Sequence, residues 1–504
     1  MKRILAVIVA MMLLIGCTSA YSETNGNPPE KPDGEMGQPP EGMGEPPQDG
    51  PGEGEPPQGS PGGNPPDGMG GPSGGPAPSG DAAKTEGVIG SWSSGGSEDY
   101  EYDAVLYVTG EGVDEEKSST DRISSGEYDA NGADGIVIED SQSGDNGIIV
   151  VDTDYTISNA NITLLTNADG SDTCDFSGRG SGIAVYGSEA NVTVEDSAIH
   201  TSGVATMPVF SDDGATVTIQ NSTLQSDGGT LSADYMNTPD QALMVAPPWI
   251  LGIMGTSRCT NMMGDNTTTN VIDSETSAGA WAVLSTDAGS DMTLNVYNTT
   301  LTLNNADESA AAPLQAEGGQ ISETLDNPYT VNYGSGYGTY VIGRAVETFA
   351  GAEINVGTYA TIFTGGSATY TALEAGRTYE LKNHAGEAAA TYEATEDKVT
   401  EIHSDTFGFM AHQNENSITV EKGTVVDSGY AMFLVKTGAS NQVLTASVDD
   451  TQITNGGVLI QVMDNDDTTN GGMMDVSDPE NTNGGSQNFK PYHTEENNMF
   501  LRLI

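Results

Sequence analysis

The chain has 504 residues, of which 73 are Asp or Glu and 16 are Lys or Arg, giving a formal net charge of −57. This charge excludes nucleic acid as a natural partner and disfavours anionic lipid surfaces and polyanionic glycans, unless metal ions intervene. The plainest explanation of the charge is solubility and self-repulsion in a salty or calcium-rich setting.

Residues 1–16 are predicted to be a lipoprotein signal peptide. The start, Met1-Lys2-Arg3, is basic, and residues 4–16 are an uncharged run too short to span a bilayer as a mature helix. The run ends in Leu14-Ile15-Gly16-Cys17, which resembles the lipobox of prokaryotic lipoproteins. That resemblance implies cleavage before Cys17, lipid attachment to its sulfur and a location on the outer face of the cell membrane. The alternative is an ordinary signal peptide with a chance cysteine.

Residues 17–86 are predicted to be a disordered tether. This segment holds 16 of the chain's 24 prolines, with Gly and Glu between them. Such a composition buries too little apolar surface to offset the cost of ordering the backbone. A flexible coil of this length spans on the order of 50 Å. It could lift the folded part off a membrane, or serve as a Pro-rich ligand.

Residues 87–504 are organised around a short recurring unit. The unit reads apolar, polar, apolar, any residue, then Asn or Asp followed by Ser or Thr, with good copies at 192–197, 217–222 and 294–299 and an early one at 136–141. The alternation predicts a strand with one buried face. The Asn or Asp predicts a bend, because its side chain bonds nearby backbone and tolerates left-handed torsions. The expected interior residues are Val194, Ile219 and Val296, and the expected bend residues are Asp196, Asn221 and Asn298.

The spacing of the copies is that of coils in a solenoid. Positions 196 and 221 are 25 residues apart, as are 273 and 298, which suits one turn of a three-sided coil. We therefore predict an all-β fold, a right-handed parallel β-helix. Over about residues 130–460 the pattern resembles the pectate-lyase-like β-helix superfamily, which includes polysaccharide lyases, polygalacturonase-type hydrolases and non-catalytic surface adhesins.

An insertion is predicted at about residues 229–270. It contains a short apolar run whose Pro247-Pro248 pair forbids a central strand. The candidate binding residues are Tyr235, Trp249, Arg258 and Asn261, a mixture suited to stacking on a sugar. The alternative is that the segment packs as a loop against a coil and belongs to the core.

Two cysteines remain after Cys17. Cys174 and Cys259 could form a disulfide in an exported protein, or both could be thiols. Further along, residues 370–400 alternate in a way that favours an antiparallel or irregular excursion from the coils.

No catalytic residue emerges from the sequence. The hydrolases of the superfamily that this chain resembles would show Gly-His-Gly and Arg-x-Lys, and neither motif occurs here. Its lyases use a calcium cluster and an Arg or Lys base, whereas the 16 basic residues are scattered. A loop beginning at Asp466 starts like an EF-hand, but Ser477 stands where the bidentate Glu belongs. No metal ligand is assigned, and Ca²⁺ is the one cofactor left open.

These features favour a lipid-anchored extracellular surface protein that performs non-catalytic adhesion or glycan binding. Its expected partners are the membrane, through the N-terminal lipid, and a polysaccharide or another cell surface. The first alternative is a calcium-dependent polysaccharide lyase or a related carbohydrate-active enzyme. The second is a structural spacer of the cell envelope.

Overall fold

The structure is a computed structural model that describes most of the chain from Tyr102 onward. The described residues are 102–141, 144–165, 177–229, 253, 255–287, 289–304, 336–412, 414–436, 443–449, 451–455, 458–464, 488–491 and 500–503. The predicted signal peptide, Cys17 and the tether lie outside them. No helix in the described part of the chain is long and apolar enough to cross a membrane.

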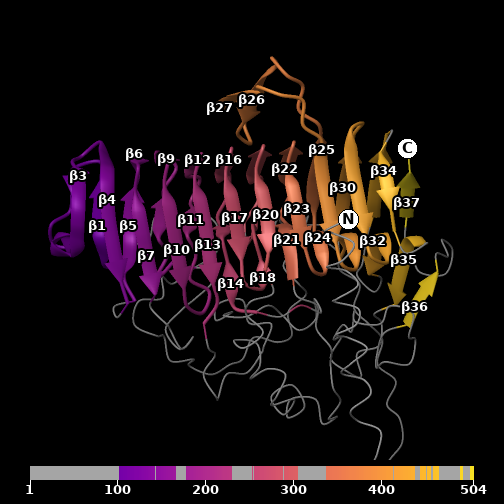
Figure 1. Cartoon of the computed structure of the whole chain (residues 1–504), viewed down its shortest axis with the longest axis horizontal. Helices are drawn as coiled ribbons and strands as arrows, with labels where there is room; N and C mark the ends of the chain where they lie inside the picture. The colour runs from indigo at the N-terminus through magenta and orange to yellow at the C-terminus, as the bar shows by residue number, and fades with distance from the viewer. Residues whose placement is uncertain are drawn as a thin grey trace, which may run out of the picture. The chain divides into compact units, whose positions relative to one another are not determined.

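The described residues form a parallel β-helix, which confirms the predicted all-β solenoid (Figure 1). Sheet 1 contains β6 (Asp154–Ser158), β9 (Asn191–Glu195), β12 (Thr216–Gln220), β16 (Thr268–Ile272), β19 (Thr293–Tyr297), β22 (Ala345–Ala350), β25 (Gly366–Thr371), β30 (Glu415–Val420), β33 (Val443–Val448) and β37 (Phe500–Leu503). Sheet 2 contains β7 (Asn161–Leu165), β10 (Ala198–Ser202), β13 (Thr223–Asp227), β17 (Glu275–Ala278), β20 (Thr300–Leu303), β23 (Glu353–Val356), β28 (Thr400–Ser404), β31 (Thr424–Ser428) and β34 (Gln452–Thr454).

Sheet 3 closes the coils in two runs. The first contains β1 (Ala104–Thr109), β5 (Asn146–Val151), β8 (Ile183–Tyr186), β11 (Val209–Asp212) and β15 (Thr260–Met262), and the second contains β14 (Ser257–Arg258), β18 (Trp281–Ala282), β21 (Gly336–Val341), β24 (Tyr359–Phe363), β29 (Phe407–Ala411), β32 (Ala431–Lys436) and β35 (Val458–Asp464). Two further strands extend sheet 3 in antiparallel pairing: β2 (Gly112–Val113) beside β1 and β36 (Asn488–Pro491) beside β35. The remaining elements are η1 (Thr120–Arg122), the antiparallel pair of β3 (Ile123–Tyr128) and β4 (Gly132–Asp140), and the antiparallel pair of β26 (Thr378–Lys382) and β27 (Ala388–Glu393).

The interior is filled by one side-chain row from each strand. Val194, Ile219 and Val296 are fully buried, as predicted. The row continues into Phe349 and Tyr370, whose rings stack with centroids 5.0 Å apart. Each buried Val or Ile contributes roughly 1.5–3 kcal/mol, so this row is a main source of stability.

The bend between sheets 1 and 2 explains the Asn or Asp of the repeated unit. Asp196, Asn221 and Asn298 have φ angles of 52°, 48° and 48°, so all three adopt the expected left-handed conformation. The amide of Asn298 donates to Asp273 Oδ1 at 2.6 Å, and that of Asn221 donates to Asp196 in the same way. Each pair therefore links neighbouring coils through its side chains as well as its backbone.

The Ser or Thr that follows satisfies backbone groups at the same bend. The Ser222 hydroxyl donates to Gln220 O at 2.8 Å and accepts the backbone N–H of Ser197 in the neighbouring coil at 3.1 Å. Ser274 and Thr299 make the same pair of contacts in the next two coils. Because these hydroxyls are buried, each one lost would leave backbone groups unsatisfied.

In the early copy of the unit, residues 136–141, the bend does not lie at the predicted position. β4 (Gly132–Asp140) runs through both sheets, since Ala133 pairs with Ile157 of sheet 1 and Ile138 with Ile162 of sheet 2. Its bend lies at Gly135, with φ of 63°, and Asp140 comes after it. The reason is that strands on both sides of the bend share the same alternation, so alternation alone does not locate the bend.

The excursion expected between residues 370 and 400 is the antiparallel hairpin of β26 and β27, which projects from the coils at the end of β25 (Figure 1). It contacts sheet 1, where Asn295 Nδ2 donates to Lys382 O at 3.1 Å. A second apolar cluster lies between the hairpin and the coils: Ile272, Tyr297, Ala350, Leu373, Leu381, Tyr392 and Ala394.

The carboxyl group of Glu347 lies inside the solenoid. Glu347 occupies the position that Leu294 takes in the preceding coil and is fully buried. Thr339 Oγ1 donates to both carboxyl oxygens at 3.0 Å, and Thr286 Oγ1 donates to Oε1 at 3.3 Å. Burial raises the pKa of Glu347 to about 8, although these two hydroxyls act in the opposite direction.

Candidate functional site

The outward side of sheet 2 presents a continuous row of polar side chains. The parallel register aligns Thr163, His200, Gln225, Ser277, Thr302, Asn355, His403 and Asp427, one from each strand from β7 to β31. The first seven are half-buried and Asp427 is exposed. We call this outward surface the polar face. Every member of the row can donate or accept hydrogen bonds from a fixed backbone position.

A second row on the polar face carries carboxylates. Glu275, Glu353 and Glu401 each stand two residues before a member of the first row. Asn355 Nδ2 donates to Glu353 Oε1 at 3.0 Å. His403 lies between two acidic groups, with Nε2 3.6 Å from Glu401 Oε2 and Nδ1 3.7 Å from Asp427 Oδ2. These contacts hold the polar side chains in defined orientations.

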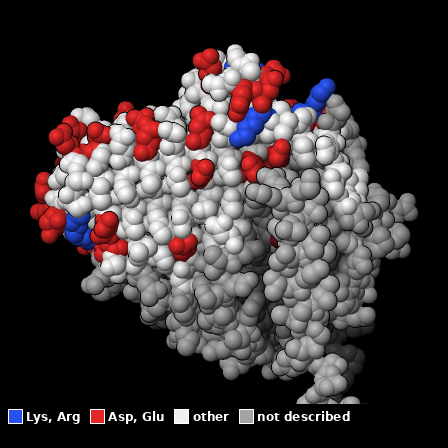
Figure 2. All heavy atoms as spheres, in the orientation of Figure 1, with Lys and Arg blue, Asp and Glu red and all other residues white. Residues whose placement is uncertain are grey.

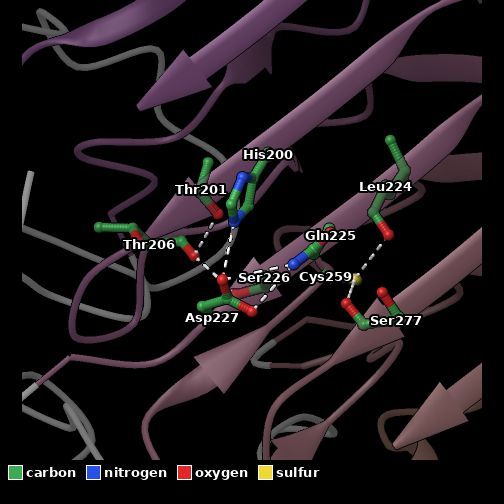
Figure 3. Close-up of polar contacts among 9 residues, drawn as sticks. All are labelled: His200, Thr201, Thr206, Leu224, Gln225, Ser226, Asp227, Cys259 and Ser277. Carbon is green, nitrogen blue, oxygen red and sulfur yellow. Dashed lines mark hydrogen bonds and ion pairs between the residues drawn. The ribbon is translucent and has the colours of Figure 1, made fainter. Parts of the chain in front are cut away.

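The tightest cluster on the polar face is formed by His200, Gln225 and Asp227 (Figure 3). His200 Nε2 lies 2.8 Å from Asp227 Oδ2, and Gln225 Nε2 donates to Asp227 Oδ1 at 3.1 Å. About a third of the His200 side chain and 41% of the Asp227 side chain are exposed. The cluster therefore offers oriented donors and acceptors to a ligand at the surface.

Buried hydroxyls on the other side of the same strands fix this cluster. Thr201 Oγ1 and Ser226 Oγ both donate to Thr206 O, at 3.0 and 3.1 Å. They tie the ends of β10 and β13 to the turn that follows β10 (Figure 3). Consequently His200 and Asp227 project from strands whose ends are held in place by buried hydrogen bonds.

Cys259 lies in the interior beneath the polar face. Its thiol is fully buried and has no disulfide partner among the described residues, and Sγ donates to Ser277 O at 2.8 Å (Figure 3). Burial raises the pKa of this thiol to about 12, which makes it unreactive at neutral pH. Cys174 lies outside the described residues, so its pairing with Cys259 stays a prediction.

Arg258, a predicted binding residue, is buried at 2% exposure. Its Nη1 is 3.1 Å from Asp287 Oδ2, and its Nη2 donates to the Tyr337 hydroxyl at 3.0 Å. The guanidinium also lies over the Trp281 ring, 4.2 Å from the centroid. In this position it links coils through an internal ion pair and is not presented to a sugar at the surface.

Asn261, the second described member of the predicted binding set, is also buried, in β15. Tyr235 and Trp249 lie outside the described residues. The described end of the predicted insertion, from Ser257, consists of the coil strands β14 and β15 and the start of β16. The structure thus places Arg258 and Asn261 in the coils and does not test the rest of the set.

Acidic side chains are unevenly distributed over the described surface. In the view of Figure 2, Asp and Glu gather along the edge that carries the β26–β27 hairpin and near the β3–β4 end, with mostly uncharged atoms between them. Among the described residues, no group of three or more His, Cys, Asp or Glu side chains is arranged to hold a metal ion.

Comparisons with protein-family models, with curated proteins and with solved structures yield no match.

Proposed function

We propose that the protein is a lipid-anchored extracellular surface protein that binds a polysaccharide along the polar face without catalysis. The observation that carries this proposal is the row of half-exposed polar side chains from Thr163 to Asp427. Neighbouring strands are about 4.8 Å apart, so eight positions span about 34 Å. An extended chain of hydroxyl-bearing sugar rings has the shape and the hydrogen-bonding groups to follow such a row.

The rigidity of the coils supports binding through many weak contacts. Each side chain in the row stands on a strand that is hydrogen-bonded on both sides, from β7, which pairs with β4 and β10, to β31, which pairs with β28 and β34. Little backbone entropy is then lost when a ligand binds. The Asp227 and Glu353 carboxylates also hold Gln225 and Asn355 in place before any ligand arrives.

The charge of the chain narrows the class of ligand. Glu275, Glu353 and Glu401 lie beside the row, and the whole chain carries a net charge of −57. Both would repel a polyanion such as pectate. A neutral polysaccharide rich in hydroxyl groups is therefore the proposed ligand class.

The position of Arg258 argues against this residue as the base of a lyase. A lyase needs an accessible base, but Arg258 is buried against Asp287. The spacer alternative needs no binding site and leaves the alignment of the polar row without a role.

The proposal is tested by incubating the full chain with a panel of insoluble neutral and acidic polysaccharides. Two quantities are measured: the protein retained, and the unsaturated or reducing ends released. We expect retention on a neutral polysaccharide without product. Product formation abolished by chelation would favour the lyase, and the absence of both signals would favour the spacer.

A matched pair of variants locates the site. Gln225 on the polar face and Gln220 on sheet 1 are both half-buried, and each donates to a carboxylate, Asp227 and Glu195 respectively. Loss of one neutral hydrogen bond costs about 0.5–1.5 kcal/mol, so Gln225→Ala should weaken binding roughly two- to tenfold. Gln220→Ala should leave it unchanged. A Trp249→Ala variant tests the predicted insertion in the same assay.

A further inference from the structure

The β26–β27 hairpin returns to the coils at a contact between a lysine and an asparagine side chain. Lys398 Nζ lies 2.5 Å from Asn298 Oδ1, across 100 residues of sequence. The Asn298 amide nitrogen in turn donates to Asp273 Oδ1 at 2.6 Å. An amine, a carboxamide and a carboxylate are thus arranged in one line of contacts.

The surrounding structure holds the three groups together. Lys398 is fixed at its backbone by two hydrogen bonds with Leu373, of 2.8 and 3.1 Å. Asn298 and Asp273 occupy successive left-handed bends with φ of 48° and 47°. The next bend residue is Gly351, where an added Cβ would lie only 3.3 Å from Lys398 Cβ and 2.5 Å from Leu373 Cδ1. The glycine therefore leaves the space through which the lysine reaches Asn298.

Buried aromatic groups shelter one side of the contact. The Tyr392 hydroxyl donates to Asp273 Oδ1 at 3.2 Å, and Tyr392 is 7% exposed. Its ring packs against Tyr297, with centroids 5.8 Å apart. Both tyrosines belong to the apolar cluster between the hairpin and the coils.

We propose that Lys398 and Asn298 form an intramolecular isopeptide bond, with Asp273 as the proton-transfer group. The deprotonated Nζ attacks Asn298 Cγ, a C–N bond forms, and the bond from Cγ to Nδ2 breaks. Asp273 takes up the proton that Nζ gives up and passes a proton to the departing nitrogen. The products are a secondary amide and ammonia, and no oxidant or other reactant is required.

Proximity is what makes the reaction feasible in the folded chain. Reacting groups held at contact distance gain the advantage of an intramolecular reaction. The product would bind the hairpin covalently to the coil that carries Asn298. It would also close a loop of 100 residues, which restricts the unfolded chain.

A tryptic peptide map of the full chain tests the bond. Trypsin releases residues 259–344, which contain Asn298, and it cannot cleave after an acylated Lys398, so residues 383–422 stay joined. We expect one branched species that contains both segments and is lighter than their sum by one ammonia. Separate 383–398 and 399–422 peptides with full masses would overturn the proposal, as would a loss of ammonia confined to one segment.

Variants assign the roles. Lys398→Arg keeps the charge and should abolish the branched species, and Asp273→Asn should slow or prevent its formation. Asn221→Asp is the matched control, because Asn221 makes the same contact with Asp196 and no lysine hydrogen bond reaches it within the described residues. That variant should retain the full yield, and a yield unaffected by Lys398→Arg would refute the assignment of the nucleophile.

Discussion

Replacing the buried Glu347 by glutamine should remove a loss of folding stability that occurs as pH rises. The ordinary pKa of a glutamate is 4.5, and burial raises that of Glu347 to about 8. Between these pH values the folded chain binds more protons than the unfolded chain, so the free energy of unfolding falls as pH rises. The contribution of Glu347 is fully present below about pH 4.5 and is lost by about pH 8.

The size of the effect follows from the gap between the two pKa values. At about 1.4 kcal/mol per pH unit, the gap corresponds to about 5 kcal/mol. Glu347→Gln keeps the shape and an acceptor for Thr339, and it carries no titrating group. Relative to the parent chain, this variant should gain up to about that amount of stability as pH rises from 4.5 to 8.

Guanidinium unfolding over a series of pH values measures this difference. Some pH dependence should remain in the variant, because burial, together with the charge of Asp213, raises the pKa of Asp212 to about 8 as well. Glu353→Gln, on the outward side of β23, is the control for the loss of one carboxylate from the same coil. A difference between Glu347→Gln and the parent that stays constant across this pH range would refute the reasoning.

Three further predictions concern the coils. Ile219→Asp should lower the free energy of unfolding by at least about 4 kcal/mol, because it places a carboxylate in the interior. The control, Thr223→Asp at an exposed position of the same coil, should change that free energy by no more than about 0.5 kcal/mol. Equal costs for the two variants would contradict the assigned interior. Asn221→Ala should be less stable than Asn221→Gly by about 1–2 kcal/mol, because only the alanine is strained at a φ of 48°; the reverse order would disprove the role of the bend. With the other cysteines replaced by serine, Cys259 should resist a maleimide in the native chain and react in guanidinium, and rapid native labelling would show that the thiol is accessible.

Much of the fold could be predicted because the bend between sheets 1 and 2 requires particular residue types, which recur in the sequence. A left-handed residue between two strands favours Asn or Asp, and the buried hydroxyl beside it favours Ser or Thr. The pair Asn221-Ser222 therefore identifies the bend of its coil in the sequence. The strands of sheet 3 have no such sequence pattern. All six residues of β21 are buried, so the strand shows no alternation of apolar and polar residues.

The site was harder to predict because it depends on the alignment between coils. His200, Gln225, Ser277 and Thr302 each stand four residues after a bend residue, and this signal identifies the row only when the bends are known. Arg258 was predicted to bind a ligand at the surface, but it is buried. Sequence alone does not show that Asp287 and Tyr337, 29 and 79 residues away, enclose its guanidinium.

The central claim is that an extended polysaccharide binds along the polar face. The most direct test measures the affinity of the full chain for a series of oligosaccharides of increasing length, taken from the polysaccharide that retains it. Affinity should rise with each added sugar until the ligand spans the row of about 34 Å, and should then level off. An affinity that reaches its full value with the shortest oligosaccharide, or that Gln225→Ala leaves unchanged, would contradict the account.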